Sequence, residues 1–331
     1  MKPIRDSHPK SDSDLVAVWI EKYLVHMQDR PGDPPRPVDN MLLCETVLSS
    51  PGDGYEVVLT RGAAGDGERV TSFVPEAPLV FINEMLLNRK ARSFASRDEL
   101  EEAFPAGEYT FTALDASGTH ALTVNLGGES GETEVPGVPT IDLLQSGGRV
   151  TGEVDSSLPL RIEWDSFVCE GSSPSSSPGW FAQNAIFLLL DNARGEMVYS
   201  SGVVPPYAEL TPDSTWITIP ADRLEPGMDY TVFLSFINYR DTDSAERADG
   251  TRLEAASVNS IAVELPFSTG GEAAAGRSRP PRPVRANYRW PGVRASEAEP
   301  LPWPVDSSGL HIDERPILPP SVPAGSEGGQ R

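Results

Sequence analysis

Proline and glycine interrupt this sequence so often that few long helices are expected. The 331 residues include 32 prolines and 29 glycines, which together exceed ordinary usage. Between these breaks, apolar residues occur in short runs rich in β-branched and aromatic side chains, a pattern typical of strands joined by turns. The sequence therefore predicts a mainly all-β protein with two β-rich domains.

The charge of the chain is strongly acidic and unevenly distributed. The formal net charge is −22, and residues 270–331 contain 8 arginines and 7 acidic residues, which leaves 19 basic and 42 acidic residues before them. An acidic body repels nucleic acid and anionic lipid. We therefore expect no nucleic-acid partner, whereas a protein or a glycan partner remains open.

Neither end of the sequence is expected to fold. Residues 1–17 are predicted to be a disordered N-terminus, and residues 270–331 contain 11 prolines and 8 glycines without a sustained apolar period. Such segments bury too little apolar surface to offset the entropy lost on ordering. We therefore predict a disordered, Pro/Arg-rich tail at 270–331.

Part of this tail concentrates arginine. The segment "RSRPPRPVRANYRWPGVR" (277–294) has six arginines with Tyr288 and Trp290 and no acidic residue. Arg277, Pro280 and Pro283 match the R-x-x-P-x-x-P pattern of polyproline II ligands, and the arginines and aromatic rings also suit phosphate binding with stacking. A plain spacer that meets the acidic body of the same chain is the simpler interpretation.

The first residues do not have the pattern of an export signal. Their charged start is not followed by an apolar run of seven or more residues, and no stretch has the pattern of a membrane-spanning segment. As written, the sequence predicts a cytoplasmic protein. An extracytoplasmic location follows instead if the start site is misassigned.

The first β-rich domain is predicted at residues 18–128. Its strands are expected at 18–28, 41–48, 55–60, 69–74 and 78–82. The first of these segments also fits a helix capped by Ser13 or Asp14, because Glu21 interrupts its period-2 apolar set.

A short helix and a hairpin complete this domain. The helix is predicted at 96–104, where Ser96 and Glu99 have the spacing of a capping box. The hairpin turns at Asp115–Gly118, and its expected core is Tyr109, Phe111, Leu122, Val124 and Leu126.

A linker at 127–139, rich in Gly, Glu and Pro, separates the second domain, predicted at 139–268. Seven strands are expected there, at 140–145, 158–164, 184–191, 196–201, 214–220, 228–238 and 257–267. Seven short strands in about 130 residues are typical of an immunoglobulin-like sandwich.

The stretch "LEPGMDYTVFLSF" (224–236) supports this architecture. Pro226 and Gly227 suit a type II turn, and the strand that follows can be buried on both faces. The spacing up to Tyr230 resembles the approach to strand F in fibronectin type III and related immunoglobulin-like domains, where a tyrosine hydroxyl bonds across the corner. Trp164 is similar to the core tryptophan of that pattern, and residues 170–179 and 240–256 depart from it as a long loop and an insertion.

The succession "FPAGEYTFTAL", "LRIEWDSF" and "LEPGMDYTVFLSF" also resembles a group of uncharacterised bacterial β proteins, many of them exported. This resemblance implies no activity. It does add weight to an extracytoplasmic location.

The two cysteines are expected to be separate buried thiols. Cys44 and Cys169 fall in different predicted domains, and a disulfide would require their Cα atoms to lie within about 7 Å. A single widely spaced pair is not a disulfide framework.

Sequence motifs of known catalytic sites are missing. The chain has no G-x-S-x-G elbow, P-loop, G-x-G-x-x-G, H-E-x-x-H or paired C-x-x-C, so we expect no enzyme, catalytic residue, cofactor or metal centre. Asp241, Asp243 and Asp249 in "DTDSAERADG" are oxygen ligands of the kind calcium prefers, but the segment lacks the EF-hand glycine and twelfth-position glutamate. A solvated loop is the alternative.

Two tryptophans could form an aromatic platform for sugar rings. Trp180 lies on a loop, and the period-2 pattern of "STWITIP" allows Trp216 to be exposed. The sequence therefore predicts a non-enzymatic structural, adhesion or protein-interaction module. A carbohydrate-binding sandwich and an enzyme with an unrecognised site are the alternatives.

Overall fold

The computed structural model describes residues 15–48, 55–62, 67–73, 80–82, 85–115, 117–127, 135–169, 181, 184–201 and 210–271. Within these ranges nearly all regular structure is strand, with one α-helix, α1 (Arg97–Ala103), and one short 3-10 helix, η1 (Ala221–Arg223). The predicted all-β fold class is therefore confirmed. The predicted disordered ends lie outside the described residues, except that residues 15–17 begin the first strand and 270–271 follow the last.

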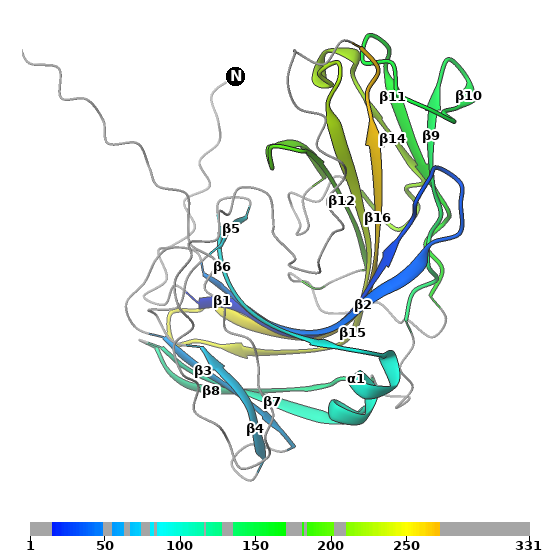
Figure 1. Ribbon diagram of the computed structural model, residues 1–331. Coiled ribbons are helices and arrows are strands. Elements are labelled where there is room, and N and C mark those ends of the chain that lie inside the picture. Colours follow the sequence, from blue (N-terminus) through cyan, green and yellow to red (C-terminus); the bar gives the residue numbers. More distant parts are fainter. Residues whose placement is uncertain are drawn as a thin grey trace, which may run out of the picture.

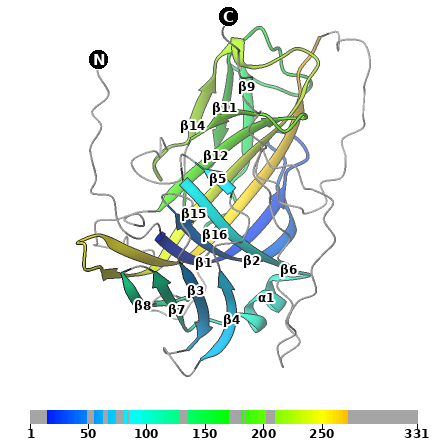
Figure 2. The ribbon, with the colours of Figure 1, turned by 90° about the vertical axis from the view of Figure 1, so that its left-hand side faces the viewer.

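One eight-stranded sheet runs through the whole fold (Figures 1 and 2). Figure 1 shows it strongly bent, with β12, β15 and β16 rising at one end and β1, β2 and β6 crossing the lower half. Its neighbouring strands are antiparallel apart from β1 and β16, which are parallel. In spatial order the strands are β13 (Met197–Ser200), β12 (Ala185–Asn192), β15 (Asp229–Glu246), β16 (Arg252–Ser268), β1 (Leu15–Met27), β2 (Arg36–Leu48), β6 (Met85–Phe94) and β5 (Val80–Ile82).

Two four-stranded sheets pack against one face of this large sheet, so the fold contains two sandwiches. The first small sheet has the order β4 (Glu68–Phe73), β3 (Glu56–Arg61), β7 (Glu108–Asp115) and β8 (Gly118–Asn125). The second has the order β10 (Gly148–Arg149), β9 (Ile141–Gln145), β11 (Leu160–Trp164) and β14 (Trp216–Ile219). At a coarse level the second sandwich is consistent with an immunoglobulin-like fold.

The β15–β16 hairpin belongs to both sandwiches. These strands are 18 and 17 residues long, far longer than the usual strand of five or six residues. The sequence prediction ended the first of these strands at residue 238 and began the second at residue 257. It treated residues 240–256 between them as an insertion. That interpretation is wrong, because the segment continues both strands and closes the hairpin at residues 247–251.

Strands from both predicted domains consequently share one sheet. β1 lies beside β16, with Ala17 opposite Glu254 and Met27 opposite Glu264. The division into domains at residues 18–128 and 139–268 stays a prediction.

The N-terminal elements follow the sequence prediction, apart from one strand that it missed. Residues 15–27 form a strand, so the alternative helix capped by Ser13 or Asp14 is wrong. Strand β6 was not predicted, because its centre is polar, and its polar side chains find partners within the fold. Asn88 Nδ2 donates to Tyr55 Oη at 3.0 Å, and Arg89 pairs with Glu45 on β2.

Helix α1 begins as its sequence indicates. Ser96 Oγ accepts the Glu99 N–H at 3.1 Å, and the Glu99 carboxylate accepts the Ala95 N–H at 3.0 Å. The helix is tied to β1 by an ion pair between Glu101 and Lys22, whose side chain is buried. These contacts confirm a short capped helix at the predicted position.

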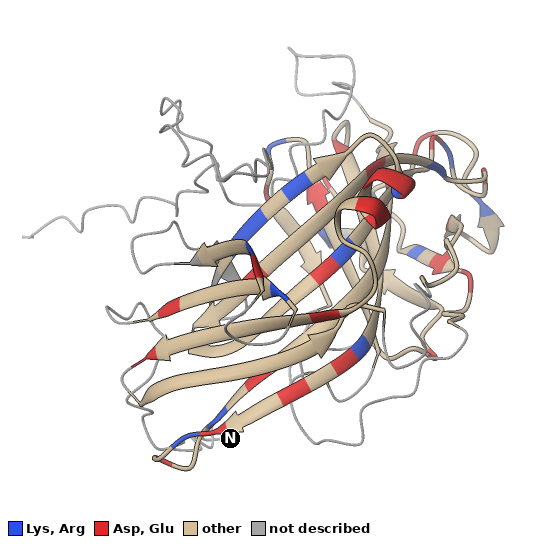
Figure 3. Cartoon of the chain, turned by 90° about the horizontal axis from the view of Figure 1, so that it is seen from below, with Lys and Arg blue, Asp and Glu red and all other residues tan. Residues whose placement is uncertain are grey.

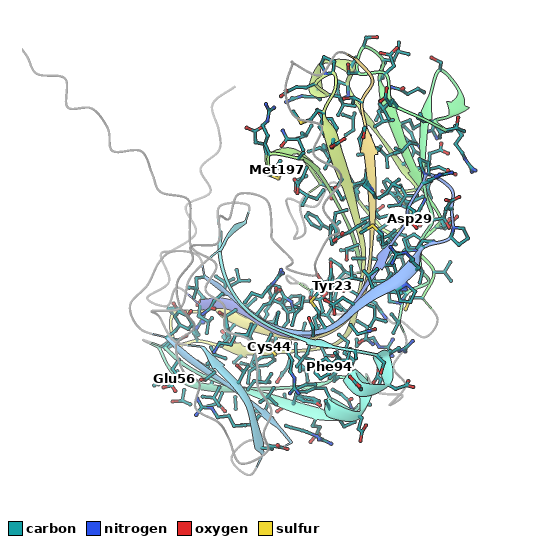
Figure 4. All side chains as sticks on the ribbon, viewed as in Figure 1. Tyr23, Asp29, Cys44, Glu56, Phe94 and Met197 are labelled. Atoms are coloured by element: carbon teal, nitrogen blue, oxygen red, sulfur yellow. The ribbon has the colours of Figure 1, made fainter. Side chains whose placement is uncertain are left out.

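A continuous apolar core lies between the large sheet and the two small ones. It includes all five side chains predicted for the hairpin core, each 0% exposed: Tyr109, Phe111, Leu122, Val124 and Leu126. In the side-chain view, Cys44 and Phe94 also lie between the large sheet and the layer that holds α1 (Figure 4). The predicted buried residues Trp164, Tyr230, Val232 and Leu234 join the same core.

The corner before β15 has the predicted contacts. Gly227 has a φ of 66°, a left-handed conformation that glycine adopts without strain. The Glu225 N–H donates to Tyr230 Oη at 2.7 Å. Tyr230 is therefore a structural corner residue.

No helix among the described residues is long and apolar enough to cross a membrane.

Candidate functional site

Trp216 is a large apolar side chain that the fold leaves in contact with solvent. It lies on β14, an edge strand of its sheet, and its residue is 51% exposed. Its neighbours Ile217 and Ile219 point into the core, as the period-2 pattern predicts. Trp180, the other half of the predicted sugar platform, lies outside the described residues.

Charged groups from β11 surround the exposed indole. The Arg161 guanidinium carbon lies 4.4 Å from the centroid of the Trp216 ring, which is a cation–π contact. Arg161 also forms an ion pair with Glu163 at 2.5 Å, and Glu163 lies directly opposite Trp216 in the strand register. We call Trp216, Thr218, Arg161 and Glu163 the Trp216 surface.

The Trp216 surface offers an apolar ring next to hydrogen-bond donors and acceptors. Arg161 and Glu163 are 45% and 36% exposed at their side chains, so a ligand can reach them without rearrangement. A flat ring with polar groups at its border can contact either a protein side chain or a sugar.

The three aspartates of the predicted calcium loop serve the backbone instead. Asp241 and Asp243 accept the N–H groups of Asn125 and Thr123 at 2.7 and 2.8 Å, and Asp249 accepts the Thr251 N–H at 2.8 Å. Asp241 and Asp243 lie on β15, whereas Asp249 lies in the hairpin turn. Among the described residues, no group of three or more His, Cys, Asp or Glu side chains is arranged to hold a metal ion.

A buried acidic and aromatic cluster lies on the opposite face of the large sheet. Trp19 Nε1 donates to Glu21 at 3.4 Å, and Phe181 contacts the rings of both Trp19 and Tyr239. Burial raises the pKa of Glu21 above its ordinary value. One feature of the sequence indicated this cluster: Glu21 interrupts an otherwise apolar period-2 pattern.

The rings of this cluster pack directly against one another. The ring centroids of Phe181 lie 5.9 Å from Trp19 and 5.2 Å from Tyr239, which are ordinary distances between aromatic rings in direct contact. A ligand held between the rings would require larger separations. The cluster therefore belongs to the apolar packing of this face.

Two further carboxyl groups on that face have strongly shifted acidity. Burial raises the pKa of Asp191 to about 7 and the pKa of Glu264 to about 7. In the strand register they are two strands apart, which separates them by roughly 10 Å or more. They do not form the closely paired carboxylates of an acid–base site.

Acidic and basic positions are interspersed on the strands seen from below (Figure 3). The strands in this view therefore present no docking face of a single charge sign. The Trp216 surface therefore stands out by its chemistry rather than by its charge.

The cysteines form no disulfide, as predicted. Cys44 is buried, and burial raises the pKa of its thiol to about 12, so little reactive thiolate is present at neutral pH. Cys169, predicted to be buried, is partly exposed.

Comparison with known proteins does not assign this chain to a family. No protein-family model matches the chain, and no curated protein sequence matches it.

Proposed function

We propose that this chain is a non-enzymatic protein-interaction module, and that it contacts its partner through the Trp216 surface. The observation that carries the proposal is the exposed indole of Trp216 beside Arg161. Tryptophan and arginine are enriched among the residues that contribute most to protein–protein binding. An exposed tryptophan on a regular strand also has little conformational freedom to lose on binding.

The architecture of the second sandwich supports this class of function. Lettered in chain order, its strands are A (β9), B (β11), C (β12), C′ (β13), E (β14), F (β15) and G (β16). The sheet A-B-E then faces the sheet C′-C-F-G, an arrangement that resembles fibronectin type III domains, as do the positions of Trp164 and Tyr230. Such sandwiches commonly serve as structural, adhesion and interaction modules.

A peptide selection tests the proposal without a known partner. The full-length chain is used to select binders from a phage-displayed random peptide library, and the selected peptides are titrated against variants. Trp216→Ala should weaken binding at least about tenfold, as expected for the loss of a central anchor. Met197→Ala is the matched control, because Met197 is 60% exposed and lies on β13 in the opposite sheet.

The outcome is decided by the comparison of the two variants. Equal affinity of the selected peptides for Trp216→Ala and for the wild type would contradict the proposal. A library that yields no binder would contradict it as well.

Carbohydrate binding is the second candidate, and the exposed indole specifically favours it. The ring face not covered by Arg161 suits stacking on a sugar ring, with Glu163 and Thr218 available as hydrogen-bond partners. On a glycan array, this alternative predicts a signal that Trp216→Phe retains and Trp216→Ala loses. Array signals that do not change with Trp216→Ala would reject it.

A further inference from the structure

The free edge of β14 carries backbone groups that point away from the sheet. The Trp164 N–H donates to the Thr215 carbonyl at 3.0 Å, which fixes the hydrogen-bonding phase of the antiparallel β11–β14 pair. In that phase, Ile217 bonds to β11, and the N–H and C=O groups of Trp216 and Thr218 face the other side. Because β14 ends the sheet order, these four groups lie on an open edge.

Another edge of the fold shows how such groups are otherwise satisfied. On β8, the N–H groups of Thr123 and Asn125 donate to Asp243 and Asp241, and Ser257 Oγ donates to the Asn125 carbonyl at 2.7 Å. In the described part of the chain, no strand or side chain bonds to the outward groups of Trp216 and Thr218. With respect to the described residues, the β14 edge is therefore open to an additional strand.

The chain itself contains a segment with the pattern of a strand for this edge. Residues 284–290 read "VRANYRW" between Pro283 and Pro291, with no proline among them. Val284, Ala286, Tyr288 and Trp290 alternate with Arg285, Asn287 and Arg289. This is the period-2 alternation of a strand with one apolar face and one cationic polar face.

We propose that residues 284–290, within the tail whose sequence predicts disorder, become ordered by adding to β14 as a further strand of the β10-β9-β11-β14 sheet. Their apolar face would continue the row of Ile217 and Ile219 on the inner side of the sheet. Their polar face, with Arg285 and Arg289, would lie on the outer side next to Trp216, opposite the contact already made by Arg161. The outward N–H and C=O groups of Trp216 and Thr218 would then be bonded.

The course of the chain makes this docking geometrically accessible. The described fold ends at Gly271, which lies against Pro226, and Thr269 Oγ1 donates to the Glu225 carbonyl at 2.6 Å. The short helix η1 lies between the C-terminal end of β14 and Glu225. The chain from the end of β14 to Glu225 therefore spans no more than about 20 Å. The 13 residues from Gly271 to Val284 can span up to about 43 Å, so the segment reaches β14 easily.

Charge also favours this occupant. The chain has a net charge of −22, whereas residues 277–294 carry six arginines and no acidic residue. Attraction to the acidic body therefore raises the local concentration of a segment that is already tethered. A second copy of the chain, which is equally acidic, would be repelled at the same edge.

Backbone amide exchange in the full-length chain tests the proposal at single residues. In the 15N-labelled wild type, the amides of Trp216 and Thr218 should exchange slowly. Asn287→Pro removes a donor from the middle of the segment and should accelerate both amides at least about tenfold, because an open edge exchanges freely. Ser308→Pro, in the same tail but outside the segment, is the control and should change neither amide.

A synthetic peptide of residues 282–292 gives a second measurement. Added in excess to the full-length Asn287→Pro variant, it should shift the amide resonances of Trp216 and Thr218, whereas the same peptide with Asn287→Pro should not. Fast exchange of both amides in the wild type, or a peptide that leaves their resonances unchanged, would overturn the proposal. Neither result would touch the proposed function, which rests on the Trp216 side chain and is decided by selected external peptides.

Discussion

Two tryptophans on adjacent strands of one small sheet point in opposite directions. Trp164 on β11 is 5% exposed, and its Nε1–H donates to the Ser214 carbonyl at 2.8 Å, whereas Trp216 on β14 is 51% exposed. The first is a core residue, and the second is available for contacts with other molecules. The same substitution at the two positions therefore separates stability from binding.

We predict that Trp164→Ala lowers the free energy of unfolding by about 3–5 kcal/mol, because it removes a large buried ring and leaves a cavity. Trp216→Ala should change it by less than about 0.5 kcal/mol, as expected for an exposed position. Urea unfolding followed by circular dichroism measures both. A loss under about 1 kcal/mol for Trp164→Ala would show that the ring is not part of the core.

The buried carboxyls Asp191 and Glu264 give the fold a defined pH dependence. Burial raises the pKa of each to about 7 in the folded chain, whereas ordinary carboxyls in an unfolded chain lose their protons near pH 4. Between these values the folded state binds more protons than the unfolded state. The contribution of these groups to the free energy of unfolding therefore decreases as pH rises from about 4 to 7.

We predict that Asp191→Asn and Glu264→Gln make the protein more stable than the wild type at pH 8. This advantage should disappear as pH is lowered towards 4, where the wild-type carboxyls are protonated in the folded state. Urea unfolding at a series of pH values provides the test, with the exposed Asp213→Asn as control. A gain at pH 8 that persists unchanged at pH 4 would show that proton binding is not its cause.

At the scale of elements, the β8 edge depends on two carboxylates. Asp241 and Asp243 occupy the backbone donors that another strand would otherwise use. We predict that the double substitution to alanine accelerates exchange of the Thr123 and Asn125 amides and destabilises the fold by about 1.5–3 kcal/mol per lost bond. Unchanged exchange of these amides would contradict the assigned role.

The same contacts make a prediction about calcium. Because two of the aspartates are bonded to β8 and the third to its own turn, added calcium should leave the melting temperature unchanged. A calcium-dependent rise that Asp249→Ala abolishes would instead support the calcium loop suggested by the sequence.

Sequence reasoning succeeded for elements whose signals are local. The Pro226-Gly227 turn, the Ser96 cap and the alternating cores of β7 and β8 each depend on residues close together in the chain. It failed for β6 and for residues 240–256, where polar side chains find partners far away in sequence. Glu45 for Arg89 and the β8 backbone for Asp241 cannot be recognised from the strand alone, because period-2 patterns report only burial of apolar groups.

The candidate site shows the same division. The alternation in "STWITIP" indicated that Trp216 could be exposed, and the structure confirms it. The approach of Arg161 was not predictable, because it depends on the register between β11 and β14. Backbone groups at a sheet edge likewise become apparent only once the strand order is known.

In the whole molecule, both sandwiches share one sheet. The tip of the β15–β16 hairpin is fixed by Arg247, which is buried with Asp115 in an ion pair of 2.9 Å and donates to the Leu15 carbonyl at 2.5 Å. These contacts join the hairpin to β7 and to the start of β1. Disruption of the contacts at the hairpin tip should therefore destabilise both sandwiches.

Calorimetry of Arg247→Met in the full-length chain tests this claim most directly. The substitution leaves the Asp115 carboxylate buried without its cation, which should cost about 3–5 kcal/mol. We predict that the wild type unfolds in one cooperative transition with equal calorimetric and van't Hoff enthalpies. In Arg247→Met this transition should move as a whole to lower temperature. Two separate transitions, of which Arg247→Met lowers only one, would contradict it.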